Sequence, residues 1–481
     1  MQVLMLILMA VVLVPIPAAA PTDSSYVAGL VAAATATLIV GCIGYATLLR
    51  RALEGPDPGR AIERAARGMR MVQWIAVGGL VLAVLGLGLL EAVRDLVGDL
   101  PLLDEAVTIA PALVVIVVAW WVFHPFERRL QESVLLRRLD DGRPVGPIPG
   151  KAAWVLMQVR LQMLVLLLPV ALLTLVSESA RLWMQSWRDP PVWLWYGVLI
   201  AAVVPIAILA PWLVVRVMGA RPMPAGDIRS SLERMCEVVD VRVRDLLLWP
   251  TGGTIVNAAV TGLVPRARWI LMTDGLLETL PRPQILAVMA HELGHARLRH
   301  MPWMAIAVVS MSMGLGIVVD TVASRILAQS PQGIAGADGA VAFGQAVDAV
   351  AVATILVSVL LLFGWISRRF ERQADAFAAV HVSRQLADAC EVVESAGVDA
   401  MSSALLGVSS TNGVSPRRFS WRHGSIESRC RHLRSLVGRR VDALPIDREI
   451  DVIKAGALSV LAASLGWWIW LAIEEVPTWT S

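Results

Sequence analysis

The chain has 481 residues, of which 57% are hydrophobic and only 17% are charged, and its formal net charge is +3. Soluble proteins are on average about 25% charged, and a small net charge provides no extended basic face for a polyanion. These values exclude a disordered chain, a collagen-like chain and a nucleic-acid-binding protein. The four cysteines stand at unrelated spacings, which excludes a disulfide framework and a cysteine-type zinc site. The composition indicates a protein of the lipid bilayer.

Long stretches without Asp, Glu, Lys or Arg recur along the chain and predict membrane-spanning helices. A helix needs about 20 mostly apolar residues to cross the hydrocarbon layer. The candidate spans lie at about 2–20, 26–49, 71–90, 106–126, 192–215, 302–319, 349–366 and 455–473, and at about 153–177, where only Arg160 interrupts the stretch. We therefore expect a mainly α, polytopic helical membrane protein with about eight or nine spans. Residues 1–20 are either the first of these spans or a cleaved signal sequence.

Arginine and lysine are concentrated in alternate loops, and this sets the expected orientation. Loops 50–70 and 127–151 are rich in basic residues, whereas loops 91–105, 178–191 and 320–348 are poor in them. Because basic loops stay on the cytoplasmic side, we expect a multi-pass protein of the cell (inner or plasma) membrane with its two long polar segments in the cytoplasm. The expected domains are an N-terminal membrane bundle (1–216), a first polar segment (217–301), a transmembrane hairpin (302–366), a second polar segment (367–453), and a C-terminal span with its tail (454–481).

The polar segment 217–301 ends in a run that contains an H-E-x-x-H motif. Prolines open the run and good helix formers follow, so we expect residues 281–300 to form one helix. Positions four apart differ by about 40° around a helix, so His291 and His295 project from one face and can bind one zinc ion. Glu292 can then serve as a general base without being a ligand itself.

A catalytic zinc site needs a third protein ligand beside a position for water. His300 would lie on the opposite side of a 281–300 helix, so we expect it to stay outside the site, exposed or at the membrane interface. Glu371 follows the span at 349–366, and the membrane hairpin returns it to the side of the motif helix, which makes it the expected third ligand. Asp375, four residues later on the same face, is expected to accept a hydrogen bond from the outer nitrogen of a ligating histidine.

H-E-x-x-H followed across a membrane hairpin by E-x-x-x-D resembles the membrane zinc metallopeptidases typified by HtpX and the CAAX prenyl endopeptidases, which are gluzincins. Three further stretches are similar to that family: 255–259 to its Asn-Ala strand beside the substrate, 269–277 to the strand and turn before the metal helix, and 422–429 to a late His-Pro-Ser-x-x-x-Arg motif. The resemblance covers roughly residues 225–435. The chain departs from the family at Gly424, where a proline is usual.

The resemblance implies a small cytoplasmic catalytic domain of the zincin-like α+β type, built from the two polar segments. It also implies one Zn²⁺ per chain, held by His291, His295 and Glu371. The implied reaction is metal-assisted peptide hydrolysis with Glu292 as the general base.

Three further residues receive expected roles from the same resemblance. His423 and Arg429 are candidate second donors to the oxyanion, and a surface or packing role is the alternative for each. Asn257 is expected to bind substrate backbone as an added strand.

The sequence thus predicts an integral-membrane zinc metalloendopeptidase that cuts membrane-associated or misfolded proteins at the cytoplasmic face. Two alternatives stay open: a sensor-transducer protease that cleaves one specific regulator, and a catalytically idle zinc-binding membrane scaffold. An intact Glu292 argues against the scaffold, because a structural zinc site needs no base. The expected partners are a protein or peptide substrate and the lipid bilayer, without nucleic acid, and the sequence leaves the oligomeric state open.

Overall fold

The computed structural model describes residues 23–55, 57–140, 142, 148–187, 192–253, 255–329, 336–386 and 391–474. The candidate first span, 2–20, lies outside these described residues. The chain divides into two compact units, Met1–Ala220 and Arg221–Ser481. Each unit has a hydrophobic core of its own.

The first unit is helical throughout its described residues. Its elements are α2 (Ser24–Leu53), α3 (Pro58–Leu87), α4 (Leu89–Val97), α5 (Leu103–Asp140), α6 (Lys151–Gln158), a π-helical turn (Val159–Leu164), α7 (Val165–Gln185) and α8 (Val192–Met218). Helix α5 packs against α2 and α3, and its Ile116, Trp120 and Phe123 are almost fully buried there. Large side chains on one central helix thus form the core of this unit.

The second unit contains a small sheet. Its strands are β1 (Arg221–Pro222), β2 (Asp245–Trp249), β3 (Ala258–Thr261) and β4 (Trp269–Thr273), in the spatial order β1-β2-β4-β3. Strands β2 and β4 are parallel, whereas β1 and β3 run antiparallel to their neighbours. All residues of β4 are buried, because β4 has a strand on each side and helices contribute to the core around it. Strand β3 is an edge strand, so one of its sides has no sheet neighbour.

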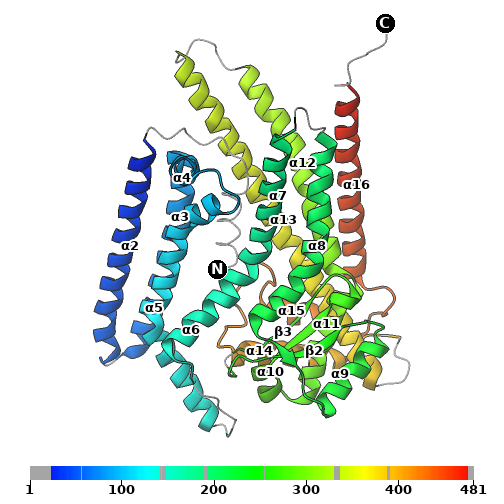
Figure 1. Cartoon of the computed structure of the whole chain (residues 1–481). Coiled ribbons are helices and arrows are strands. Elements are labelled where there is room, and N and C mark those ends of the chain that lie inside the picture. Colours follow the sequence, from blue (N-terminus) through cyan, green and yellow to red (C-terminus); the bar gives the residue numbers. More distant parts are fainter. Residues whose placement is uncertain are drawn as a thin grey trace. The chain divides into compact units, whose positions relative to one another are not determined.

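The helices of the second unit supply both its remaining core and its membrane part. They are α9 (Asp227–Val238), the short 3-10 turn Pro265–Ala267, α10 (Asp274–Thr279), α11 (Arg282–Arg297), α12 (His300–Ala328), α13 (Gly336–Leu386), α14 (Ser395–Thr411), α15 (Ile426–Arg434) and α16 (Pro445–Glu474). Helices α12 and α13 pack against each other, and α16 packs against α12 (Figure 1). Leu232 of α9, Met289 of α11 and Met401 of α14 join the strand residues in one core.

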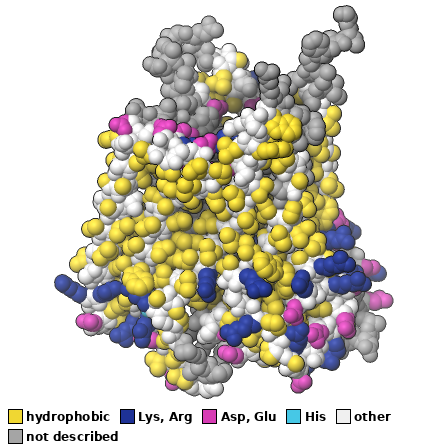
Figure 2. Space-filling view, viewed as in Figure 1, with side chains coloured by type: hydrophobic (Ala, Val, Ile, Leu, Met, Phe, Trp, Pro, Cys, Tyr) yellow, Lys and Arg dark blue, Asp and Glu magenta, His cyan; other side chains and the backbone are white. Residues whose placement is uncertain are grey.

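Seven described helices are long and apolar enough to cross a membrane. They are Ser24–Leu53, Pro58–Leu87, Leu103–Ser133, Lys151–Gln185, His300–Ala328, Ala346–Ser383 and Pro445–Leu471, and Val203–Met218 is a shorter apolar helix. Hydrophobic side chains cover the long helices, and charged side chains gather near their ends (Figure 2). The prediction of a mainly helical, multi-pass membrane protein with a small α+β part is confirmed. The count differs from about eight or nine, because 2–20 lies outside the described residues and only Val203–Met218 of α8 (Val192–Met218) counts, as a shorter apolar helix.

Helix α13 is a single helix of 51 residues. It carries both the apolar stretch expected to span the membrane and, further along, Glu371. We expected a span that ends near residue 366 and a separate polar segment after it. The helix instead continues to Leu386, and residues 367–386 contain no glycine or proline that would end it.

Candidate metal centre

The two histidines of the motif lie on α11, directly after β4 and the short helix α10. Pro281 caps the start of α11, where its missing N–H costs no helical hydrogen bond. His291 and His295 are one turn apart, so both imidazoles leave the same face of the helix. Gly294, between them, faces α13: a Cβ at this position would lie 3.0 Å from the ring of Phe377. A glycine therefore lets the backbones of α11 and α13 approach closely enough for side chains from both to meet.

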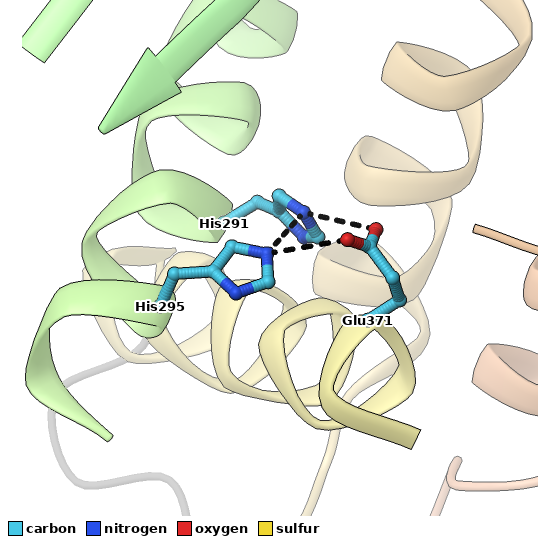
Figure 3. A group of neighbouring side chains, drawn as sticks. All are labelled: His291, His295 and Glu371. Carbon is cyan, nitrogen blue, oxygen red and sulfur yellow. Dashed lines mark hydrogen bonds and ion pairs between the residues drawn. The ribbon is translucent and has the colours of Figure 1, made fainter. Parts of the chain in front are cut away.

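His291, His295 and Glu371 point toward one another (Figure 3). The Nε2 atoms of the two histidines are 3.2 Å apart, and each is 3.6 Å from a carboxylate oxygen of Glu371. Zinc bonds of about 2.0–2.1 Å at tetrahedral angles place the ligand atoms about 3.3 Å apart. The three separations fit this geometry, and two imidazoles with one carboxylate are a usual donor set for catalytic zinc.

Asp375 and Arg429 form hydrogen bonds and ion pairs that hold the residues of this group in place. The Oδ1 atom of Asp375 lies 3.0 Å from Nδ1 of His291, the ring nitrogen that faces away from Glu371. Arg429 donates to both oxygens of Asp375, at 2.8 and 2.6 Å, and its Nη1 lies 3.1 Å from Glu371. A planar guanidinium thereby holds two carboxylates in fixed positions, and both carboxylates are buried.

His423 reaches the same group from a turn between α14 and α15. Its Nδ1 lies 2.9 Å from Oε1 of Glu371, and about half of its side chain is exposed. Ser420 and Gly424 close the turn with two backbone hydrogen bonds, and Gly424 adopts a φ of 74°. The resembling peptidases usually have a proline at this position. Proline is restricted to a φ near −65°, so it could not adopt the backbone conformation of Gly424.

Burial and neighbouring charges shift the titration of the motif residues. Burial lowers the pKa of His291, but hydrogen bonds with Asp375 and Glu371 outweigh it and raise the value to about 10. Burial raises the pKa of Glu292 to about 7, with a contribution from the charge of Glu371 and opposition from His291. Burial holds the pKa of His295 well below its usual value, although Glu371 opposes this. The buried carboxylates therefore favour a positive charge among them, which a metal ion provides.

Glu292 faces the edge strand of the sheet. The backbone N–H of Val260 in β3 donates to Oε2 of Glu292 at 3.0 Å. Because neighbouring residues of a strand direct their N–H groups to opposite sides, this bond marks the side of β3 that faces away from β4. Asn257 directly precedes β3 with an exposed side chain, and its described hydrogen bonds join its own backbone groups to the hydroxyl and the backbone N–H of Thr273.

The expectation for His300 was wrong. His300 is 3% exposed, and its Nδ1 lies 2.8 Å from Nδ1 of His295. The expectation assumed one continuous helix over 281–300, but α11 ends at Arg297 and α12 begins at His300. Arg299, between them, adopts a left-handed φ of 56°, and this break turns His300 back toward the outer nitrogen of His295.

The interpretation of the sequence missed two other residues. The Oε1 atom of Gln373 lies 2.9 Å from Nε2 of His300, and its Nε2 donates to Asp447 at 2.7 Å, so a chain of contacts runs from His295 to α16. Asn412 pairs with both backbone groups of Val256 and thereby holds the segment that enters β3. Gln373 lies two residues after Glu371 on α13, and this spacing was the only feature of the sequence that could have indicated its role. No feature of the sequence indicated the role of Asn412.

Comparisons with known proteins agree with this geometry. The family model described as "Peptidase family M48" matches residues 222–437. A protein named CAAX prenyl protease 1 homolog, from Arabidopsis thaliana, is 27% identical over 202 residues, which cover 39% of this chain and 44% of the relative. Protease HtpX from Serratia proteamaculans is 33% identical over 141 residues, which cover 27% of this chain and 45% of the relative. The chain thus spans less than half the length of these two curated relatives.

A crystal structure of S. mikatae Ste24p aligns with 86% of this chain and 100% of its own, at 16% identity and a TM-score of 0.48. The matched family segment begins at β1 and ends just after α15. It therefore contains the H-E-x-x-H helix, Glu371, Asp375 and the turn with His423. The resemblance to the membrane peptidases typified by HtpX and the CAAX prenyl endopeptidases is confirmed, because residues 222–437, a little under half of the chain, match the model of this peptidase family.

Proposed function

We propose that the chain is an integral-membrane zinc metalloendopeptidase that hydrolyses peptide bonds of membrane-associated or misfolded proteins at the cytoplasmic face. The observation that carries the proposal is the convergence of the ligand atoms of His291, His295 and Glu371 within 4.8 Å of one another, with Glu292 beside them. One zinc ion held by these three residues would supply a Lewis acid that polarises the scissile carbonyl and activates water.

Glu292 has the position of a general base. It lies next to a ligand on α11, yet its carboxylate is directed to Val260 of β3. A peptide bond placed between the three donors and β3 would be within reach of this carboxylate. Glu292 would accept a proton from the attacking water and return it to the leaving amine.

Strand β3 supplies the surface along which a substrate backbone would lie. Its free edge faces Glu292, so an extended peptide can add to the sheet there with backbone hydrogen bonds. Asn257, at the start of this strand, is placed to bind the same backbone with its exposed side chain. Such binding needs an unfolded or flexible segment, which fits misfolded proteins as substrates.

The two residues of the late motif have different roles in this proposal. His423 keeps about half of its side chain exposed beside Glu371, so it can donate to the oxyanion that forms during hydrolysis. Arg429 is buried and already bonded to Asp375 and Glu371, so we assign it to holding those carboxylates in place. The cytoplasmic location follows from the basic residues of loops 50–70 and 127–151.

The test is the replacement Glu292→Gln in the full-length protein, purified in detergent. We expect cleavage of a quenched-fluorescence peptide pool to fall by about 10²–10⁴-fold, because the proton acceptor is lost, with zinc retained. Zinc per chain is measured by mass spectrometry. The matched control is Glu233→Gln, which makes the same change at an exposed carboxylate paired with Arg229. Undiminished cleavage by Glu292→Gln would contradict the role of Glu292 as the base, whereas zinc binding without any cleavage by the unaltered protein would leave a zinc-binding scaffold as the explanation.

A further inference from the structure

A cleft of about 470 Å³ borders the metal centre on the side of the membrane helix α12. His295 forms part of its wall, together with Gly262 after β3 and Met301 and Pro302 at the start of α12. Four arginines also line it: Arg242, Arg268, Arg297 and Arg299. No part of the proposed reaction uses this cleft.

The cleft carries more positive charge than its surroundings neutralise. Asp240 is the only carboxylate among its lining residues, and it lies 3.3 Å from Nη1 of Arg297. Arg268 donates to the carbonyl of Leu263 at 2.9 Å and so holds the loop after β3. Burial lowers the pKa of Arg268, and the nearby charge of Arg299 lowers it further.

Arg242 and Arg299 remain available for a ligand. Both side chains are exposed, and neither arginine forms an ion pair with any described residue of the chain. The left-handed backbone of Arg299 between α11 and α12 places it at this cleft, four residues after His295 in the chain. Guanidinium groups bind carboxylates with two parallel hydrogen bonds, so the pair is suited to an acidic group.

The loop at the end of β3 relates the cleft to the reaction. Val260, which contacts Glu292, is followed two residues later by Gly262 in the cleft wall. Two residues of strand correspond to about 7 Å. Gly262 has a φ of 102°, and a Cβ there would collide with the backbone of Ala267, so this wall is closely packed.

We infer that the cleft is a substrate subsite for an acidic side chain, Asp or Glu, that lies two or three residues from the scissile bond. The inference rests on the proposed peptidase function. A peptide added along β3 with its scissile bond at Glu292 would place such a residue beside Arg242 and Arg299. The walls formed by His295 and Gly262 favour a peptide over a lipid headgroup, because the occupant lies between the metal centre and the strand edge.

The experiment uses the full-length protein in neutral detergent and pairs of quenched peptides that differ only by Glu or Gln. The Glu is placed in turn at each of about three positions on either side of the cleavage site. We expect about a tenfold higher kcat/KM for Glu over Gln at one position two or three residues from the cut, as for a hydrogen-bonded charge pair. The double variant Arg242→Gln/Arg299→Gln should lose this preference and cleave the Gln peptides as the unaltered protein does.

Controls separate the possible results. Arg440→Gln, an exposed arginine paired with Asp442, should keep the Glu preference. Arg299→Glu should transfer the preference to a Lys peptide, which a general loss of folding cannot do. Cleavage of all peptides without any Glu preference would overturn the subsite and leave the peptidase function intact. No cleavage of any peptide would overturn both.

A lipid arm tests the other source of an anionic group. Phosphatidylglycerol is added to phosphatidylcholine vesicles that contain the protein, and Gln-peptide cleavage is measured. If phosphatidylglycerol stimulates cleavage only while Arg242 and Arg299 are present, and no Glu preference exists, the cleft binds lipid headgroups and the subsite is wrong. A Glu preference that is unchanged by phosphatidylglycerol supports the subsite.

Discussion

Each unit of the molecule buries a group of carboxylates, and the two groups are built differently. In the first unit, Asp104 lies 2.6 Å from Arg94, which also approaches Glu105 at 3.6 Å. In the second unit, Arg429 holds Asp375, but Glu371 is directed at two imidazoles. Arg94 thus pairs with the carboxylates of the first group, while the second group also brings together two imidazoles.

The difference shows that buried charge alone does not make a metal site. Among the described residues, three or more histidine, cysteine or carboxylate ligand atoms converge only in the group with Glu371. Asp104 faces Arg94, whereas the oxygens of Glu371 also face His291 and His295, although Arg429 contacts Glu371 as well. A site needs ligand atoms that face a common point, and imidazoles supply them without adding charge when they ligate a metal in the neutral form.

The largest expected effect is on zinc binding, and it compares a Glu→Gln replacement in one buried carboxylate group with the same replacement in the other. Glu371→Gln should abolish stoichiometric zinc binding and cleavage, because an amide is a poor replacement for a ligating carboxylate. Glu105→Gln, at the buried carboxylate of the first unit, should leave one zinc per chain. Zinc is measured by mass spectrometry after dialysis against a weak chelator. Equal zinc contents in the two variants would contradict the assignment of Glu371 as a ligand.

A second prediction concerns stability in the first unit. Arg94→Gln leaves Asp104 and Glu105 without their cation, and both are buried. Breaking a fully buried pair costs about 3–5 kcal/mol, and we expect about 2–3 kcal/mol because the Arg94 side chain is 31% exposed. Thermal unfolding in detergent measures the loss, while zinc content should stay unchanged. A variant as stable as the parent would show that solvent, rather than Arg94, compensates the carboxylates.

The smallest expected effect tests the contact that supports His295. His300→Ala should weaken zinc binding by about 10–100-fold, because the outer nitrogen of a ligating histidine loses its partner. Gln373→Ala, one contact further away, should weaken it less. Competition with a fluorescent chelator gives both affinities. If Gln373→Ala is the more damaging change, His300 does not act through this chain of contacts.

The sequence predicted those parts of the site that depend on local geometry. The pairing of His291 and His295 follows from the helical repeat, and the proximity of Glu371 follows from a membrane hairpin that returns to the same side. His300 was misplaced, because one helix was assumed to continue to residue 300, although α11 ends at Arg297 and Pro302, in the first turn of α12, was an available signal of the break. The edge position of β3 depends on the pairing of β2 with β4, which local sequence does not encode.

The membrane spans were also predicted from a local pattern, but the ends of the helices that contain them were not. Uninterrupted apolar stretches identify membrane helices because the bilayer has a fixed thickness. Helix ends outside the bilayer have no such rule, so the continuation of α13 beyond residue 366 was missed. Similarly, α5 extends to Asp140, well past the apolar stretch expected at 106–126.

The length of α13 limits how the protein can be divided. Its membrane-spanning stretch and Glu371 belong to one helix, so a soluble fragment cut at the bilayer surface would begin only a few residues before Glu371. The first turn of a helix lacks hydrogen-bond partners for its N–H groups and frays readily. A truncated domain would therefore lose the fixed position of its carboxylate, and crystallisation or screening of this protein requires the intact chain in a lipid or detergent environment.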